Sequence, residues 1–323
     1  MLTYPDFEQK QILFVLLSYG EKISFKNDNV IITDNEDKVK HQSTCYKLFI
    51  LFVVGHITIT SGILQRAQKF GFTIVLLSHY FKFIGLWSSK TEGNVLLRKK
   101  QYGYAGLDIA KHIVSNKIQN QISALRMIRK RGEELNSAVE FLKKQLEELQ
   151  KAENAGLQNL LGFEGVCSRI YFKGLYSNIQ WTGRKPRVKA DSANALLDIG
   201  YTILFNIIDA ILNSYGFDVY QGVYHTNFYQ RKSLTCDLVE PFRPVIDMQI
   251  RKAYNLQMVK KEDFSIIEKQ YRLFGKKAEP YILYLLEGIL KYKKPLFLYL
   301  QSYYRAFIKD KKIEDYPVFN LGD

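Results

Sequence analysis

The spacing of apolar residues changes near residue 92, and this change is the strongest constraint on the fold. Before it, Lys22–Lys26 and Val30–Thr33 alternate between apolar and polar residues, and Lys47–Val54 is almost continuously apolar. Both patterns are typical of β-strands. After it, from Leu107 to Leu125, apolar residues recur at every third or fourth position, which is typical of a helix. We therefore predict an α+β fold, in which an N-terminal β-sheet or β-sandwich domain precedes an all-α domain.

The predicted boundaries follow from the same change. The β-rich domain covers residues 1–92, a polar linker covers 93–100, and the helical domain covers 101–323. An exposed sheet edge in the first domain would suit a dimer contact, so we expect a homodimer.

Local signals in the first domain predict a hairpin and one helix. The turn-forming residues 27–29 (NDN) separate two alternating strands. Thr60 is suited to begin a helix over Ser61–Phe70, and Gly71 is suited to end it. Further strands are expected over residues 72–78 and 83–87.

The second domain contains a series of helical patterns. They cover residues 107–125, 133–153, 155–174, 193–212, 238–256, 264–274, 281–290 and 296–309. The pattern over 133–153 is amphipathic and charged, and it fits either a solvated helix packed along one stripe or a helix on a membrane surface. We expect the last ten residues to be loosely held.

The charge of the chain points to a polyanionic partner. The formal net charge is +14 and the pI is about 9.4. Residues 1–90 carry ten Lys and Arg against seven Asp and Glu, so +11 of the charge lies in residues 91–323. Nucleic acid is the first expectation and an acidic membrane surface the second. Each basic cluster alone could be a solvated face, but together they favour nucleic acid.

Other features restrict the class of protein. The three cysteines show no metal-binding or disulfide pattern, and no apolar run is long enough to span a bilayer. We expect a soluble cytoplasmic protein without a membrane span. No nucleotide-binding glycine loop or Gly-x-Ser-x-Gly motif occurs. Cys236 could be a nucleophile or a small buried thiol.

One stretch, residues 225–247, gathers the side chains best suited to chemistry. His225 precedes Asp237 and Glu240, which lie three residues apart and would share a helical face. Pro241 and Pro244 have no N–H groups, so they would leave the carbonyls of Asp237 and Glu240 without helical partners. This arrangement suggests a hard metal ion.

A fourth candidate lies upstream. Glu164 continues the apolar stripe of the helix over 155–174, where an unpaired carboxylate would cost several kcal/mol. An ion pair with Arg or Lys would satisfy it, and a metal is the alternative. Carboxylates with a single imidazole suit Mg²⁺ or Mn²⁺ better than structural zinc.

Several motifs, taken in order, resemble a known family. They are GFEGVCSRIYF (162–172), RKPR and DSANALLDIGYTIL (184–204), GFDVYQGVYH (216–225) and SLTCDLVEPFRPVID (233–247). KHIVSNKIQNQ (111–121) and the β-rich stretch 55–78 are also similar. The chain resembles the CRISPR-associated integrase, the larger of the two core proteins that acquire new spacers. One difference is residues 191–194 (DSAN), where relatives commonly have Asp-Pro-x-Asn.

The resemblance implies a fold, an activity and a set of partners. It implies a β-rich dimerisation domain and a helical catalytic domain that cuts and joins DNA with Mg²⁺ or Mn²⁺. A 3′-hydroxyl of a captured fragment, double-stranded with single-stranded ends, would attack phosphodiesters of the repeat DNA. A small dimeric partner protein is also implied. The alternative hypothesis is a non-catalytic, basic DNA-binding protein of an architectural kind.

The resemblance also assigns residues. Glu164, His225 and Glu240 would be the catalytic metal ligands, with Asp237 assisting. For phosphate contacts we predict a set of basic residues: Arg184, Arg187, Arg243, Arg129, Lys130 and Arg131.

Overall fold

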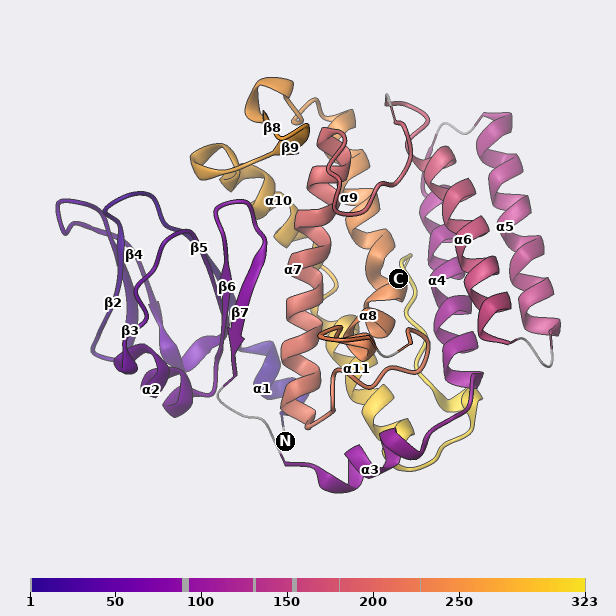
Figure 1. The fold of residues 1–323 in the computed structure, drawn as a ribbon, viewed down its shortest axis with the longest axis horizontal. Helices are drawn as coiled ribbons and strands as arrows, with labels where there is room; N and C mark the ends of the chain where they lie inside the picture. Colours follow the sequence, from indigo (N-terminus) through magenta and orange to yellow (C-terminus); the bar gives the residue numbers. More distant parts are fainter. Residues whose placement is uncertain are drawn as a thin grey trace.

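The computed structural model describes residues 2–88, 93–129, 132–152, 156–179, 181–226 and 228–322. Strands gather in the first part of the chain and helices dominate the rest, so the predicted α+β class is confirmed (Figure 1). Lys130 and Arg131 lie outside the described residues.

A four-stranded sheet connects the two parts of the molecule. Its strands, in spatial order, are β1 (Gln11–Leu16), β5 (Leu48–Val54), β6 (Thr73–Leu77) and β7 (Phe83–Trp87). β1, β5 and β6 run parallel, and β7 is antiparallel to β6. Every residue of β5 is buried, which explains its continuous apolar run. Its side chains alternate, so Ile50 and Phe52 face the helical core while Leu51 and Val53 face the N-terminal core.

A three-stranded antiparallel sheet and one helix cover the other side of that sheet. They are β2 (Lys22–Lys26), β3 (Asn29–Thr33), β4 (Val39–Thr44) and α2 (Ser61–Phe70). The predicted hairpin and the predicted helix are confirmed, the helix ending at Gly71 with φ 71°. β1 and β4 were not predicted. β4 is polar and largely exposed, so its sequence carries little strand signal.

The predicted linker is partly helical. α3 (Val95–Gly103) begins at Asn94, whose side chain accepts a hydrogen bond from the backbone N–H of Leu97. Leu97 is fully buried in the helical core, and so is Phe7 of α1 (Tyr4–Glu8). Both ends of the β-rich part are therefore tied to the helices.

Three long helices form one side of the helical part. They are α4 (Asp108–Arg126), α5 (Glu133–Lys151) and α6 (Leu157–Leu175), which lie side by side at the right of Figure 1. α7 (Ser192–Tyr215) runs through the middle of the molecule, between this group and the sheet. α7 has the length and composition of a membrane span, but 78% of its most apolar window is buried, as expected of a core helix.

The predicted helix over 238–256 is wrong at its start. Two helices, α8 (Ser233–Val239) and α9 (Arg243–Asn255), flank a 3-10 turn, η2 (Glu240–Phe242). The two prolines fall in the first turns of η2 and α9, where a missing N–H costs little. α10 (Glu279–Leu290) and α11 (Lys293–Ile308) follow the remaining predictions closely.

Residues 264–274 do not form the predicted helix. They contain a hairpin of β8 (Ser265–Ile267) and β9 (Gln270–Arg272), so this part of the chain is not purely helical. Its turn residues Glu268 and Lys269 have φ of 52° and 61°, a two-residue turn that the hairpin's twist favours.

The chain after α11 is firmly packed, contrary to the prediction. Phe319 and Leu321 are buried, 3% and 2% exposed, against α4. Asn116 and Asn120 of α4 hydrogen-bond the backbone N–H and C=O groups of these residues at 2.8–3.0 Å. Buried amide side chains, together with the burial of Phe319 and Leu321, therefore hold a segment whose backbone is irregular.

Candidate active site

Glu164 and Glu240 approach each other across a lysine that the sequence hypothesis did not include. α6 carries Glu164, η2 carries Glu240, and α4 carries Lys117. The Lys117 ammonium contacts Glu164 Oε1 and lies 2.6 Å from Glu240 Oε2. The side chains of Lys117 and Glu240 are 7% and 5% exposed, whereas that of Glu164 is 24% exposed. The partner that Glu164 was predicted to need is therefore, in this structure, a buried cation.

The break between α8 and α9 aims Glu240 at this cation. The backbone N–H of Glu240 donates to the carbonyl of Asp237, and that of Arg243 donates to the carbonyl of Glu240. These 3-10 hydrogen bonds occupy the two carbonyls that the prolines were predicted to leave free. The two carbonyls therefore have helical partners, and the prediction that the prolines would leave them free is wrong.

Asp237 performs a different task from Glu240. It is fully buried, and its carboxylate accepts hydrogen bonds from the backbone N–H groups of Val223, Tyr224 and His225 at 2.7, 3.1 and 2.9 Å. Its Oδ1 also lies 2.7 Å from Nδ1 of His225. Because an ionised carboxylate only accepts hydrogen bonds, Nδ1 carries a proton, and in the neutral imidazole Nε2 then has a free electron pair. Asp237 thus fixes the loop and the tautomer of His225.

The charges around Glu240 favour its ionised form. Burial opposes that form, but Arg243 and Lys117 outweigh burial and lower the pKa of Glu240 to about 2. Arg243 Nε forms an ion pair with Glu240 Oε1 at 2.9 Å. Burial, and then the charges of Glu164 and Glu240, raise the pKa of the Tyr224 phenol well above its usual range. That buried hydroxyl has no hydrogen-bond partner among the described residues.

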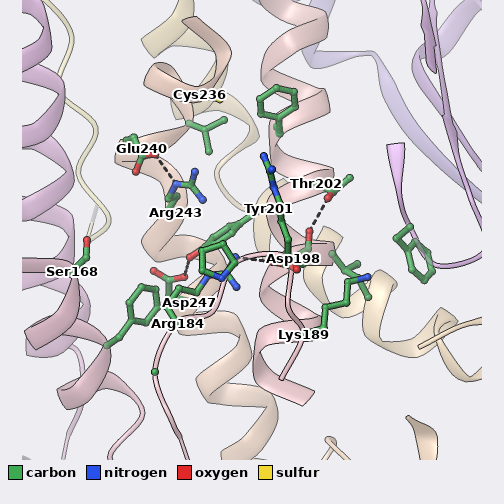
Figure 2. Close-up of a pocket in the computed structure, with 18 of the residues that line it drawn as sticks. Ser168, Arg184, Lys189, Asp198, Tyr201, Thr202, Cys236, Glu240, Arg243 and Asp247 are labelled. Carbon is green, nitrogen blue, oxygen red and sulfur yellow. Dashed lines mark hydrogen bonds and ion pairs between the residues drawn. The ribbon is translucent and has the colours of Figure 1, made fainter. Parts of the chain in front are cut away.

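Arg243 is held in place by aromatic and acidic neighbours, as Figure 2 shows. Its guanidinium carbon lies 4.5 Å from the ring centroid of Tyr201, and the hydroxyl of Tyr201 donates to Asp247. Arg184 lies over the same ring at 5.5 Å and pairs with Asp198 at 2.6 Å. Arg243 therefore adjoins Glu240 directly, whereas much of the Arg184 guanidinium is occupied by other partners.

A groove of about 2110 Å³ opens in front of these residues. Glu164, Glu240, Lys117 and Arg243 line it, and a further set of cations surrounds them: Lys82, Arg169, Lys173, Arg184, Arg187, Lys189, Arg231, Lys232 and Arg272. Arg187 is exposed on the groove, whereas the exposed Arg129 is not among the residues that line it. The phosphate contacts that we predicted for Arg184, Arg187, Arg243 and Arg129 remain predictions.

The donor chemistry fits a hard divalent ion, although the side chains do not yet form a closed ligand shell. Across the described residues, no three His, Cys, Asp or Glu side chains come together closely enough to hold a metal. Two carboxylates nevertheless converge on one cation, the Lys117 ammonium, and Asp237 orients the His225 imidazole as a metal-ligating histidine requires. Glu164 and Glu240 could therefore hold a metal at or near the position of that ammonium, whereas His225 is not among the described residues that line the groove.

Comparison with known proteins decides the family. A family model described as CRISPR associated protein Cas1 matches residues 14–283. The chain belongs to the Cas1 family. It is 30% identical over 239 residues to CRISPR-associated endonuclease Cas1 1 of Thermodesulfovibrio yellowstonii, covering 70% of this chain and 74% of that protein. It is 28% identical over 264 residues to CRISPR-associated endonuclease Cas1 4 of Methanospirillum hungatei, covering 78% and 73%.

Solved structures share the fold. A Cas1 protein from Thermotoga maritima is 18% identical, with a TM-score of 0.78 over 91% of this chain and 97% of that one. A casposase bound to an integration product is 17% identical, with a TM-score of 0.80 over 97% and 96%. A chain of a Cas6-RT-Cas1–Cas2 complex is 22% identical, with a TM-score of 0.80. The match covers 97% of this chain but only 36% of that longer one.

Sequence reasoning missed two residues of this Cas1 site. Lys117 lies three residues after Val114 and four before Gln121, on a buried face of α4. A lysine on such a face is a signal that could have been used, since a buried ammonium requires acidic partners. Tyr201 sits among the apolar residues of α7, and nothing in its spacing distinguishes it from a core tyrosine.

Proposed function

We propose that this Cas1 chain is a divalent-metal-dependent DNA endonuclease and integrase of CRISPR adaptation. It would insert short DNA fragments into the repeat array by attack of a 3′-hydroxyl on a phosphodiester, a transesterification. The observation that carries the proposal is the convergence of Glu164 and Glu240 on one cation in a basic groove. The names of the similar proteins, which include endonuclease, support the same activity.

The metal and the protein would divide the chemistry. When bound, Mg²⁺ or Mn²⁺ supplies a Lewis acid that polarises the phosphodiester. Glu164, Glu240 and Nε2 of His225 would hold it, and the hydrogen bond from His225 Nδ1 to Asp237 keeps Nε2 free for that purpose.

Arg243 would position a phosphate beside this centre. Its side chain is 27% exposed and pairs with Glu240 through Nε, so the other guanidinium N–H groups can face the groove. A planar guanidinium binds phosphate oxygens in pairs, which fixes orientation as well as charge. The guanidinium packs on the ring of Tyr201, and the hydrogen bond from the Tyr201 hydroxyl to Asp247 fixes that ring.

We also propose the partners. The basic groove suits double-stranded DNA with single-stranded ends and the CRISPR repeat DNA that receives it. A homodimer and a small dimeric adaptation protein are proposed as protein partners, since a protein of the same fold is known from a Cas6-RT-Cas1–Cas2 complex. The proposed location is the cytoplasm, where such DNA is reached.

Three substitutions test the proposal: Glu164→Gln, His225→Ala and Glu240→Gln. Each should abolish strand transfer on a labelled repeat substrate while DNA binding is largely retained. Glu134→Gln is the matched control. Glu134 also lines the groove, but its carboxylate pairs with Lys173, at 3.0 Å, instead of with Lys117. EDTA should remove the activity and Mn²⁺ should restore it.

The rival function is a non-catalytic DNA-binding protein of an architectural kind. It shares the basic groove and therefore the DNA binding, so binding alone cannot separate the two. Strand transfer that is unchanged in all three variants would support the rival and exclude the enzyme.

A further inference from the structure

The charges of the two acids in the site, Glu164 and Glu240, are balanced without a metal. Glu164 and Glu240 bring two negative charges, and Lys117 and Arg243 bring two positive charges within 2.9 Å of them. Lys117 contacts both carboxylates, so its ammonium lies between the two groups that would ligate a divalent ion. The metal-free site therefore has a resident cation of its own.

A divalent ion and this ammonium need the same oxygen atoms. Mg²⁺ lies about 2.0–2.1 Å from its oxygen ligands and tolerates little distortion. Glu240 Oε2 is already 2.6 Å from Lys117 Nζ, and Glu164 Oε1 is in direct contact with it. Both cations at one pair of carboxylates would also place three positive charges within a few ångströms in a poorly solvated site. A metal bound to these two oxygens would therefore move the ammonium.

The structure contains an acceptor for the displaced ammonium. Gln121 lies one helical turn after Lys117 on α4, so the two side chains are neighbours on the same face. Its Nε2 donates to Ser168 Oγ at 3.3 Å, while its buried Oε1 has no hydrogen-bond partner among the described residues. Lys117, Gln121 and Ser168 all line the groove.

We propose that Lys117 is a built-in counter-cation of the metal site. Without metal it holds Glu164 and Glu240 together. A divalent ion displaces it from the carboxylates toward Gln121 and the groove, where its charge faces the DNA phosphates. The inference rests on the proposed metal-dependent function, because it requires that Mg²⁺ or Mn²⁺ bind at these carboxylates.

Mn²⁺ binding to the full chain tests the proposal without an activity assay. Titration of Mn²⁺ followed by electron paramagnetic resonance gives the Kd of wild type, Lys117→Met and Lys117→Arg. Removing the competing charge should tighten binding at least about tenfold in Lys117→Met. Lys117→Arg should bind more weakly than wild type, because a bidentate guanidinium pairs with carboxylates more firmly than an ammonium.

A control and a second readout complete the test. Lys173→Met removes one groove charge whose ion pair, within the described part of the chain, is with Glu134, so the Mn²⁺ Kd of this variant should stay within about twofold of wild type. In EDTA, Lys117→Met should melt at a lower temperature than wild type. Mn²⁺ should raise the melting temperature of Lys117→Met by more than it raises that of wild type. Should Lys117→Met fail to fold, Lys117→Arg still decides, since it keeps the positive charge.

The outcomes distinguish a failure of the proposed role of Lys117 from a failure of the proposed metal-dependent function. Equal or weaker Mn²⁺ binding in Lys117→Met, or equal or tighter binding in Lys117→Arg, would overturn the counter-cation. If the double variant Glu164→Gln, Glu240→Gln binds Mn²⁺ as tightly as wild type, the metal site is overturned instead, and with it the proposed function.

Discussion

Replacing Asp237 by Asn separates the two roles that its position allows, an additional metal ligand or an anchor for the loop that carries His225. Four donors converge on its buried carboxylate, three backbone N–H groups and the imidazole Nδ1–H. An asparagine of the same shape has one oxygen and can accept only about two of them, while its NH₂ group faces the other donors. Two hydrogen bonds to a charged group are lost, each contributing about 1.5–3 kcal/mol.

We therefore expect Asp237→Asn to lower the free energy of unfolding by about 3–6 kcal/mol. Urea denaturation in EDTA measures this in the absence of metal. Asp218→Asn is the control, because Asp218 is less buried and accepts from the Tyr102 hydroxyl and one backbone N–H, so its loss should be below about 1 kcal/mol.

The same variant should weaken Mn²⁺ binding by about 10–100-fold, the usual effect of losing the group that orients a ligating histidine. Wild-type stability in Asp237→Asn would refute the anchoring role. Loss of Mn²⁺ binding as complete as in Glu240→Gln would show that Asp237 is itself a ligand.

Other contacts give three further predictions. Asn120→Ala removes the amide that hydrogen-bonds the backbone of Phe319, Leu321 and Pro241, so we expect the free energy of unfolding to fall by about 3 kcal/mol. Limited proteolysis followed by mass spectrometry should show earlier cleavage after residue 316. Burial raises the pKa of Asp247 to about 6, so the folded protein binds this proton more tightly than the unfolded chain, and the contribution of Asp247 to stability is lost as pH rises from about 4 to 6. Relative to wild type, Asp247→Asn should therefore gain about 2 kcal/mol of unfolding free energy between pH 4.5 and 7 in urea titrations, and a constant difference would contradict this. Arg187→Ala should lower the slope of log Kd for DNA against log salt by about 1. An unchanged slope in Arg129→Ala, whose side chain is outside the groove lining, would refute the phosphate contact predicted for that residue.

The parts of the fold that could be predicted from the sequence are those with local causes. The helix Ser61–Phe70 was predicted correctly because its ends carry their own signals, a threonine at the start and a glycine with φ 71° at the end. The switch from strands to helices was visible because each element repeats its own period.

The failures have physical reasons of a non-local kind. The hairpin at Ser265–Arg272 turns through Glu268 and Lys269, which adopt positive φ without the Asn or Gly that usually marks such a turn. The segment after α11 is ordered by Asn116 and Asn120, which lie about 200 positions earlier in the chain. No local pattern contains that information.

The candidate site shows the same division. The family motifs identified Glu164, His225 and Glu240, and the structure brings Glu164 and Glu240 together and places His225 beside Asp237. The role of Asp237 could not be read from its spacing to Glu240, because it depends on three backbone N–H groups in a loop some 12–14 residues away. Lys117 was missed because its partners lie on two other elements.

The central claim is that Glu164 and Glu240 form a cation site that is filled by Lys117 without metal and by a divalent ion when one is present. Crystals of the full chain soaked in Mn²⁺ test this directly through the anomalous signal of manganese. We predict one strong peak bonded to Glu164 Oε1, Glu240 Oε2 and His225 Nε2, with the Lys117 ammonium moved toward Gln121. An anomalous peak elsewhere, or Lys117 unmoved between the two carboxylates at saturating Mn²⁺, would contradict it.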